Sequence, residues 1–172
     1  MSARECRWNI RSGAGPLEVE GHMSRANKID LAEARASYGR WGPMVLRFCE
    51  LFLGEKSLAE EVTAESFIRF LRGGGRAATN GVPVALLRFA LQAASESPAR
   101  NGGPSEPLLV AIGQLDALPR AVFILHGVMA VQMPWVGAIL GMSAEEAARL
   151  WAKALIEVRQ RLPQDFFKER GR

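Results

Sequence analysis

Two cationic side chains near the end of the chain have the type and spacing to bind nucleic acid. Arg149 and Lys153 are four residues apart, so on a helix they share one face. Both residue types bind phosphate, and arginine also reads guanine through two parallel hydrogen bonds. Ser143, Glu145 and Glu146 lie just before them, where a carboxylate repels phosphate but accepts a hydrogen bond from cytosine. These five residues are candidates for a DNA-binding surface.

The sequence around these side chains predicts two helices joined by a tight turn. Pro134 can open the first helix, and Gly141 supplies the turn. Ser143 is a suitable N-cap for the second helix, with Glu146 three residues later as its capping-box partner, and Pro163 ends that helix. A helix-turn-helix places its second helix in the DNA major groove. An αα-hairpin that binds nothing has the same spacing, so the pattern leaves both alternatives open.

A row of carboxylates marks a second candidate surface, in a helical block over residues 29–71. Ser57 is predicted to cap a helix there, and Pro43 to restart the helix before it. Glu60, Glu61 and Glu65 fall on the face opposite the apolar positions of that helix. Their ordinary role would be solubility and compensation of the helix dipole. Their alternative role is to bind a basic or polar partner.

Residues suited to catalysis or metal binding are few and scattered. His22 and His126 are far apart and lack Cys or carboxylate partners at ligand spacing. His126 follows an apolar run and is predicted to be a hydrogen-bonded structural histidine, and Cys49 is predicted to be a buried thiol. The sequence therefore predicts a protein that is not an enzyme and that uses no metal, cofactor or small-molecule substrate.

Helical patterns without strands predict an all-α protein of two small helical domains joined by a linker, the C-terminal one a helix-turn-helix. The expected order is a disordered tail over residues 1–28, an N-terminal helical domain over 29–94, a Gly/Pro/Ser-rich linker over 95–107, and the C-terminal domain over 108–172. The 172 residues carry a modest net charge of +4. The chain lacks a bilayer-spanning run and a secretory signal, which predicts a cytoplasmic protein without membrane contact.

The order of these motifs resembles the small, extracytoplasmic-function type of bacterial sigma-70 factors. In that family a helix of the N-terminal domain reads Ala-Glu-Asp-hydrophobic-x-Gln-Glu-x-Phe, and Ala59–Phe67 matches it in register. Leu118-Pro119 and the hydrophobic run after it match the opening of the family's C-terminal domain. Leu140–Ser143 fits the turn, and Lys153-Ala154 fits an Arg-Ala pair late in the recognition helix. The resemblance covers residues 29–162.

The resemblance implies a transcription initiation factor that binds core RNA polymerase and directs it to promoter DNA. It implies an anti-sigma protein as a further partner. The implied polymerase-binding residues are Ala59, Glu60, Glu61, Glu65 and Phe67. The implied DNA-binding residues are Ser143, Glu145, Glu146, Arg149 and Lys153 in the −35 reader, with Arg88 in the segment that resembles the −10 reader.

Departures from the family pattern fall on the DNA-facing parts. The family's Thr-Val-Lys at the front of the recognition helix is Glu146–Ala148 here, and Gly137 replaces the usual alanine of the first helix. The segment from Ser143 to Leu162 contains four basic and three acidic residues, so its net charge is only +1. These departures keep a second hypothesis open. In it, the chain is a sigma-like interaction module that binds polymerase or an anti-sigma protein and has lost DNA recognition.

Overall fold

The computed structural model describes residues 31–73, 81–97, 106–163 and 166, and every regular element among them is helical. The predicted tail over residues 1–28 and most of the predicted linker lie outside the described residues. The all-α fold class is confirmed for the part of the chain described. The elements are α1 (Leu31–Leu53), α2 (Lys56–Arg72), α3 (Gly81–Glu96), α4 (Pro107–Gly113), α5 (Ala117–Val122), the π-helix η1 (Phe123–Val128), α6 (Met133–Leu140) and α7 (Ala144–Arg161).

Helix α1 runs through Pro43 without a break, so the prediction of a restart at that proline was wrong. Its buried positions, Val45, Phe48 and Phe52, recur at intervals of three and four residues and form one continuous apolar stripe. Burial of that stripe against α2 and α3 outweighs the hydrogen bond that a proline removes from a helix interior. Gly54 then ends the helix in the left-handed region, at φ 72°.

Helix α2 begins at Lys56, one residue before the predicted cap, so the predicted Ser57–Glu60 capping box does not form. Glu55 has the extended N-cap backbone, and the Ser57 hydroxyl donates to its carboxylate at 2.6 Å. The predicted apolar face of α2 is confirmed, because Leu58, Val62, Phe67 and Phe70 are buried. Two small polar residues, Thr63 and Ser66, are also buried there, and each hydroxyl donates to the carbonyl four residues earlier.

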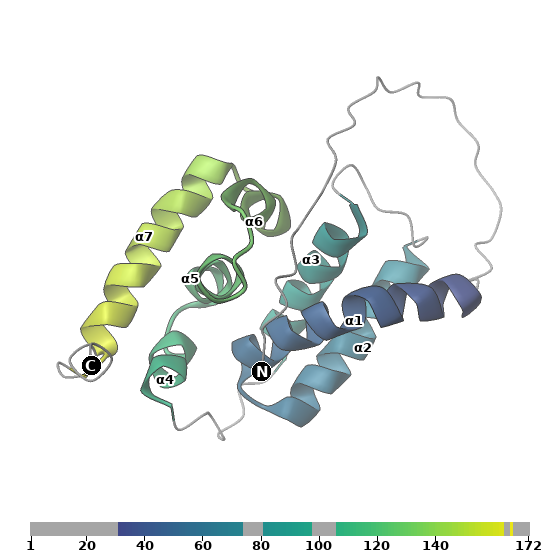
Figure 1. The fold of residues 1–172 in the computed structure, drawn as a ribbon, viewed down its shortest axis with the longest axis horizontal. Coiled ribbons are helices and arrows are strands. Elements are labelled where there is room, and N and C mark those ends of the chain that lie inside the picture. Colours follow the sequence, from purple (N-terminus) through teal and green to yellow (C-terminus); the bar gives the residue numbers. More distant parts are fainter. Residues whose placement is uncertain (1–30, 74–80, 98–105, 164–165, 167–172) are drawn as a thin grey trace, which may run out of the picture.

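Helices α1 to α3 form one unit and α4 to α7 with η1 form another, and the two units pack against each other. In Figure 1, α4 to α7 lie on one side of α1 to α3, and α7 forms the outer edge. Contacts join α3 to α6 and α1 to η1 and α4, so one buried apolar cluster includes residues of both units. Helix α3 continues to Glu96, two residues beyond the predicted end of the first unit.

The π-helix η1 positions two aromatic contacts against α7. The Trp151 ring lies edge-on to His126 and packs on Phe123, with ring centroids 5.1 and 5.0 Å apart. The Nδ1 atom of His126 is 2.9 Å from the carbonyl oxygen of Val131, which confirms the predicted hydrogen-bonded structural histidine. Gly127 has no room for a side chain, because a Cβ there would lie 2.6 Å from the Trp151 ring. These contacts fix the orientation of α7 relative to the rest of its unit.

Candidate nucleic-acid and protein interfaces

The α6–α7 hairpin has the local geometry that its sequence predicted. Gly141 adopts the left-handed conformation at φ 74° and ends α6. The capping box at the start of α7 is confirmed: the Ser143 hydroxyl accepts from the Glu146 N–H at 3.2 Å, and the Glu146 carboxylate accepts from the Ser143 N–H at 2.8 Å. The Ser143 backbone and hydroxyl groups hold the pKa of Glu146 below its usual range. Ser143 and Glu146 therefore define where α7 begins.

Gly137 explains how closely α6 approaches the turn. A Cβ built on Gly137 would lie 2.7 Å from the carbonyl oxygen of Met142 and 3.1 Å from the backbone carbon of Ser143. The departure from the family's usual alanine thus coincides with a direct backbone contact. The two helices of this hairpin pack without an intervening side chain at that point.

The outer face of α7 combines cations with apolar side chains. Arg149 and Lys153 are both exposed, but Lys153 also lies 3.9 Å from the Glu157 carboxylate. Trp151 packs inward against Phe123, whereas Leu155 is 46% exposed. The neighbouring Ile156 is 58% exposed. Ile156 follows Arg149 by seven residues and shares its face of α7, whereas Leu155 lies about 120° around the helix from Arg149, beside the buried face.

The Arg88 side chain contacts α6 of the second unit. Its Nη2 donates to the Ala138 carbonyl at 2.6 Å and its Nε to the Ile139 carbonyl at 3.4 Å. Both acceptors lie in the last turn of α6, where the helix dipole is negative. In this conformation Arg88 serves as a contact between the units, and its assignment to promoter DNA stays a prediction.

The acidic face of α2 is exposed, and its three carboxylates differ in their partners. Glu60 lies 4.0 Å from Lys56, and Glu65 accepts from Arg69 at 2.9 Å. Glu61 is exposed and makes no ion pair within the described part of the chain. Such exposed pairs contribute little to stability, typically under about 1 kcal/mol each. The carboxylates thus remain available to an external cation.

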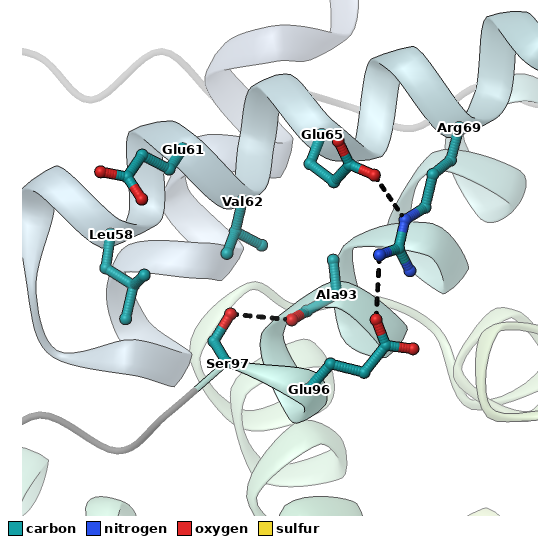
Figure 2. A pocket seen from close by; sticks show the side chains of 8 residues that line it. All are labelled: Leu58, Glu61, Val62, Glu65, Arg69, Ala93, Glu96 and Ser97. Carbon is teal, nitrogen blue, oxygen red and sulfur yellow. Dashed lines mark hydrogen bonds and ion pairs between the residues drawn. The ribbon is translucent and has the colours of Figure 1, made fainter.

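A hollow of about 330 Å³ lies beside this acidic face, between α2 and α3. Figure 2 shows Arg69 reaching across it, from Glu65 on its own helix to Glu96 on α3, which it contacts at 2.9 Å. These contacts lower the pKa of Glu96 and raise that of Arg69. The lining contains three carboxylates, those of Glu61, Glu65 and Glu96, and one guanidinium, so it is net negative.

Two residues of the matched motif lie in the core instead of on this surface. Ala59 is fully buried, and Phe67 is 4% exposed with its ring 4.9 Å from that of Tyr38. Their role in this structure is to hold α2 against the rest of its unit, which turns Glu60 and Glu61 outward.

The sequence did not predict two residues of these surfaces, Arg69 and Glu96, or the contact between the two units that Arg120 makes with Phe52. The spacing of Glu65 and Arg69, four apart on one helix, was a usable signal. The contacts of Arg69 with Glu96 and of Arg120 with Phe52 join residues far apart in sequence, so spacing carries no sign of them.

Comparisons with known proteins bear on the fold. No family model and no curated protein matches this sequence. A co-crystal structure of the sigma factor RpoE with the anti-sigma factor NepR, from Bartonella quintana, matches with a TM-score of 0.59 at 13% sequence identity. The match covers 76% of this chain and 97% of that chain. The chain therefore has the fold of a sigma factor. In the part of the chain described, no helix is long and apolar enough to span a membrane.

Proposed function

We propose that this protein is a sigma-type transcription initiation factor, which binds core RNA polymerase and directs it to promoter DNA. The observation that supports this most is the fold match, because it spans nearly all of a solved sigma factor and includes both helical units. The motif at Ala59–Phe67 adds to it, since burial of its apolar members turns its carboxylates outward.

In this proposal α2 and α7 have separate roles. The Glu60 and Glu61 carboxylates dock against a basic or polar groove of the polymerase. Helix α7 enters the major groove, with Arg149 as the side chain best placed to reach a base and Lys153 to reach a phosphate. Glu145 lies on the same exposed face and limits binding to unrelated sequences by repelling phosphates.

A second candidate function, a sigma-like interaction module without DNA recognition, is favoured by two observations. Leu155 and Ile156 present apolar area on α7, and Arg88 is held by α6. The solved sigma factor is bound to an anti-sigma factor. We include an anti-sigma protein among the proposed partners of this chain under either function.

Charge reversal on α2 tests polymerase docking. The double variant Glu60→Lys with Glu61→Lys should weaken binding to purified core polymerase by tenfold or more at low salt, because two exposed attractions become repulsions. Binding is measured by titration with a fluorescently labelled chain. The matched control is Glu106→Lys with Glu145→Lys, which reverses two exposed carboxylates of the other unit.

The control should bind core polymerase as the wild type does. Circular dichroism establishes that both double variants remain helical. Equal affinity of the α2 variant and the wild type, with both folded, would rule out this face as the polymerase contact.

A further inference from the structure

One arginine from each helical unit caps the C-terminal end of a helix in the other unit. Arg88 on α3 donates to Ala138 and Ile139 in the last turn of α6, at 2.6 and 3.4 Å. In the reverse direction, Arg120 on α5 donates to the Phe52 carbonyl in the last turn of α1, at 3.2 Å. The two contacts are reciprocal, and each places a cation at the negative end of a helix dipole.

Arg120 is the more deeply held of the two arginines. Its guanidinium lies over the Phe52 ring at 5.2 Å and donates to the Gly113 and Leu115 carbonyls at 2.5 and 2.8 Å. Its Nε atom is buried without a hydrogen-bond partner. Two carbonyls of its own unit, together with the carbonyl and the ring of Phe52, hold its guanidinium, so Arg120 has more partners than Arg88.

Arg88 is held more weakly and can be released. Its side chain is exposed, and within the described residues its partners are two neutral carbonyls and no carboxylate. Hydrogen bonds from a guanidinium to phosphate are charge-assisted and stronger than those to neutral oxygens. A phosphate at Arg88 would therefore compete with the α6 carbonyls, and the same guanidinium cannot serve both.

We propose that Arg88 and Arg120 form a latch that holds the two helical units closed. In the closed state Arg88 is engaged with α6. When an anionic ligand of the phosphodiester class binds Arg88, the α3–α6 contact is lost and the units separate, with Arg120 as the contact that is retained longest. That promoter DNA is the ligand that releases the latch rests on the function proposed above. Closure itself does not.

Energy transfer between two dyes tests closure on the full-length chain alone. Arg72→Cys on α2 and Gln160→Cys on α7 give one exposed labelling site in each unit. Cys6→Ser removes one native thiol. Cys49 needs no change, because it is fully buried and burial raises its pKa to about 11, so it stays unreactive.

Arg88→Gln should lower the transfer efficiency relative to the wild type. Arg88→Lys keeps a cationic donor near α6, so its transfer efficiency should lie between those of the wild type and Arg88→Gln. The matched control is Arg47→Gln, which removes an exposed arginine whose ion pair with Glu50, at 3.8 Å, lies within α1. That control should equal the wild type. Unchanged transfer in Arg88→Gln, and also in the double variant Arg88→Gln with Arg120→Met shown to be folded by circular dichroism, would overturn the latch.

Titration with a short DNA duplex separates the latch from the proposed function. Duplex DNA should lower the transfer efficiency of the wild type and leave that of the open Arg88→Gln variant nearly constant. If Arg88→Gln opens the chain but DNA does not bind to the wild type, closure by Arg88 stands and the DNA-reading role is overturned. If DNA binds to the wild type without opening it, release of the latch by a phosphodiester is overturned.

Discussion

Gly137 is the residue on which the closest approach in the α6–α7 hairpin depends. Gly137→Ala introduces the alanine that is usual in the sigma factors that this sequence resembles, yet it should destabilise this protein by about 1–3 kcal/mol. The reason is that its Cβ would meet backbone atoms of Met142 and Ser143, which cannot move aside as a flexible side chain would. Urea denaturation followed by circular dichroism measures the change.

The matched control for this substitution is Gly39→Ala in α1. A Cβ on Gly39 meets nothing within 4 Å, so this variant should gain stability, by up to about 1 kcal/mol, from alanine's helix propensity. Equal stability of Gly137→Ala and the wild type would show that the hairpin is looser than described.

Glu146 gives the start of α7 a pH dependence with a defined sign. Its folded-state pKa lies below the usual value because the Ser143 N–H and hydroxyl donate to the carboxylate. The stability it contributes is therefore present above the unfolded pKa of about 4.3 and is lost as the pH falls through the folded value. The stability gap between the wild type and Glu146→Gln should narrow from pH 7 to pH 3. A gap that is constant with pH would contradict the capping role.

The sequence predicts side-chain contacts well only where the two residues are close together in the chain. Ser143 and Glu146 are three residues apart, so their capping box depends only on the helix between them. Arg88 was assigned to DNA from its place in a segment that resembles a −10 reader. Its contacts with Ala138 and Ile139 could not be predicted, because they span about fifty residues. No spacing rule connects such positions.

Helix existence was readable from apolar periodicity, whereas helix boundaries depended on tertiary packing. The apolar stripe of α1 continues through Pro43, and burial of Val45 and Phe48 keeps the helix intact where the proline rule predicted a restart. At α2 the capping-box pattern at Ser57 misplaced the start, because the extended residue Glu55 serves as the N-cap. At such ends, packing or an alternative cap outweighs the local signal.

Helix α7 should distinguish base contacts from phosphate contacts if it reads DNA. Arg149→Ala should cost roughly 1–3 kcal/mol on the preferred duplex and relax the choice of base at one position. Lys153→Ala should weaken binding to all duplexes alike and reduce the salt slope by about 1. Because Glu157 already lies 3.9 Å from Lys153, this second effect is expected to be the smaller one.

The measurement is a salt titration of the full-length chain on several duplexes, with Arg72→Ala as the control for loss of one exposed arginine. Wild-type binding that is undetectable even at low salt would favour the interaction-module function.

The arrangement of the two units is the part of the structure that the sequence did not predict. The linker composition indicated two separable helical domains, but the described residues share one buried apolar cluster and two reciprocal arginine contacts. Those contacts depend on where helix ends meet in space. Whether the units separate in solution, as the linker prediction implies, stays a prediction that the energy-transfer experiment tests.

The most direct test of the proposed function is transcription by purified core RNA polymerase on a library of promoter fragments, with and without this chain. We predict discrete transcripts from a subset of fragments that appear only when the chain is present. The Glu60→Lys/Glu61→Lys variant should reduce the amount of these transcripts. The single variant Glu106→Lys, which leaves the proposed DNA-facing Glu145 unchanged, should not. A folded wild-type chain that neither binds core polymerase nor produces any specific transcript would contradict the proposal that it is a sigma-type initiation factor.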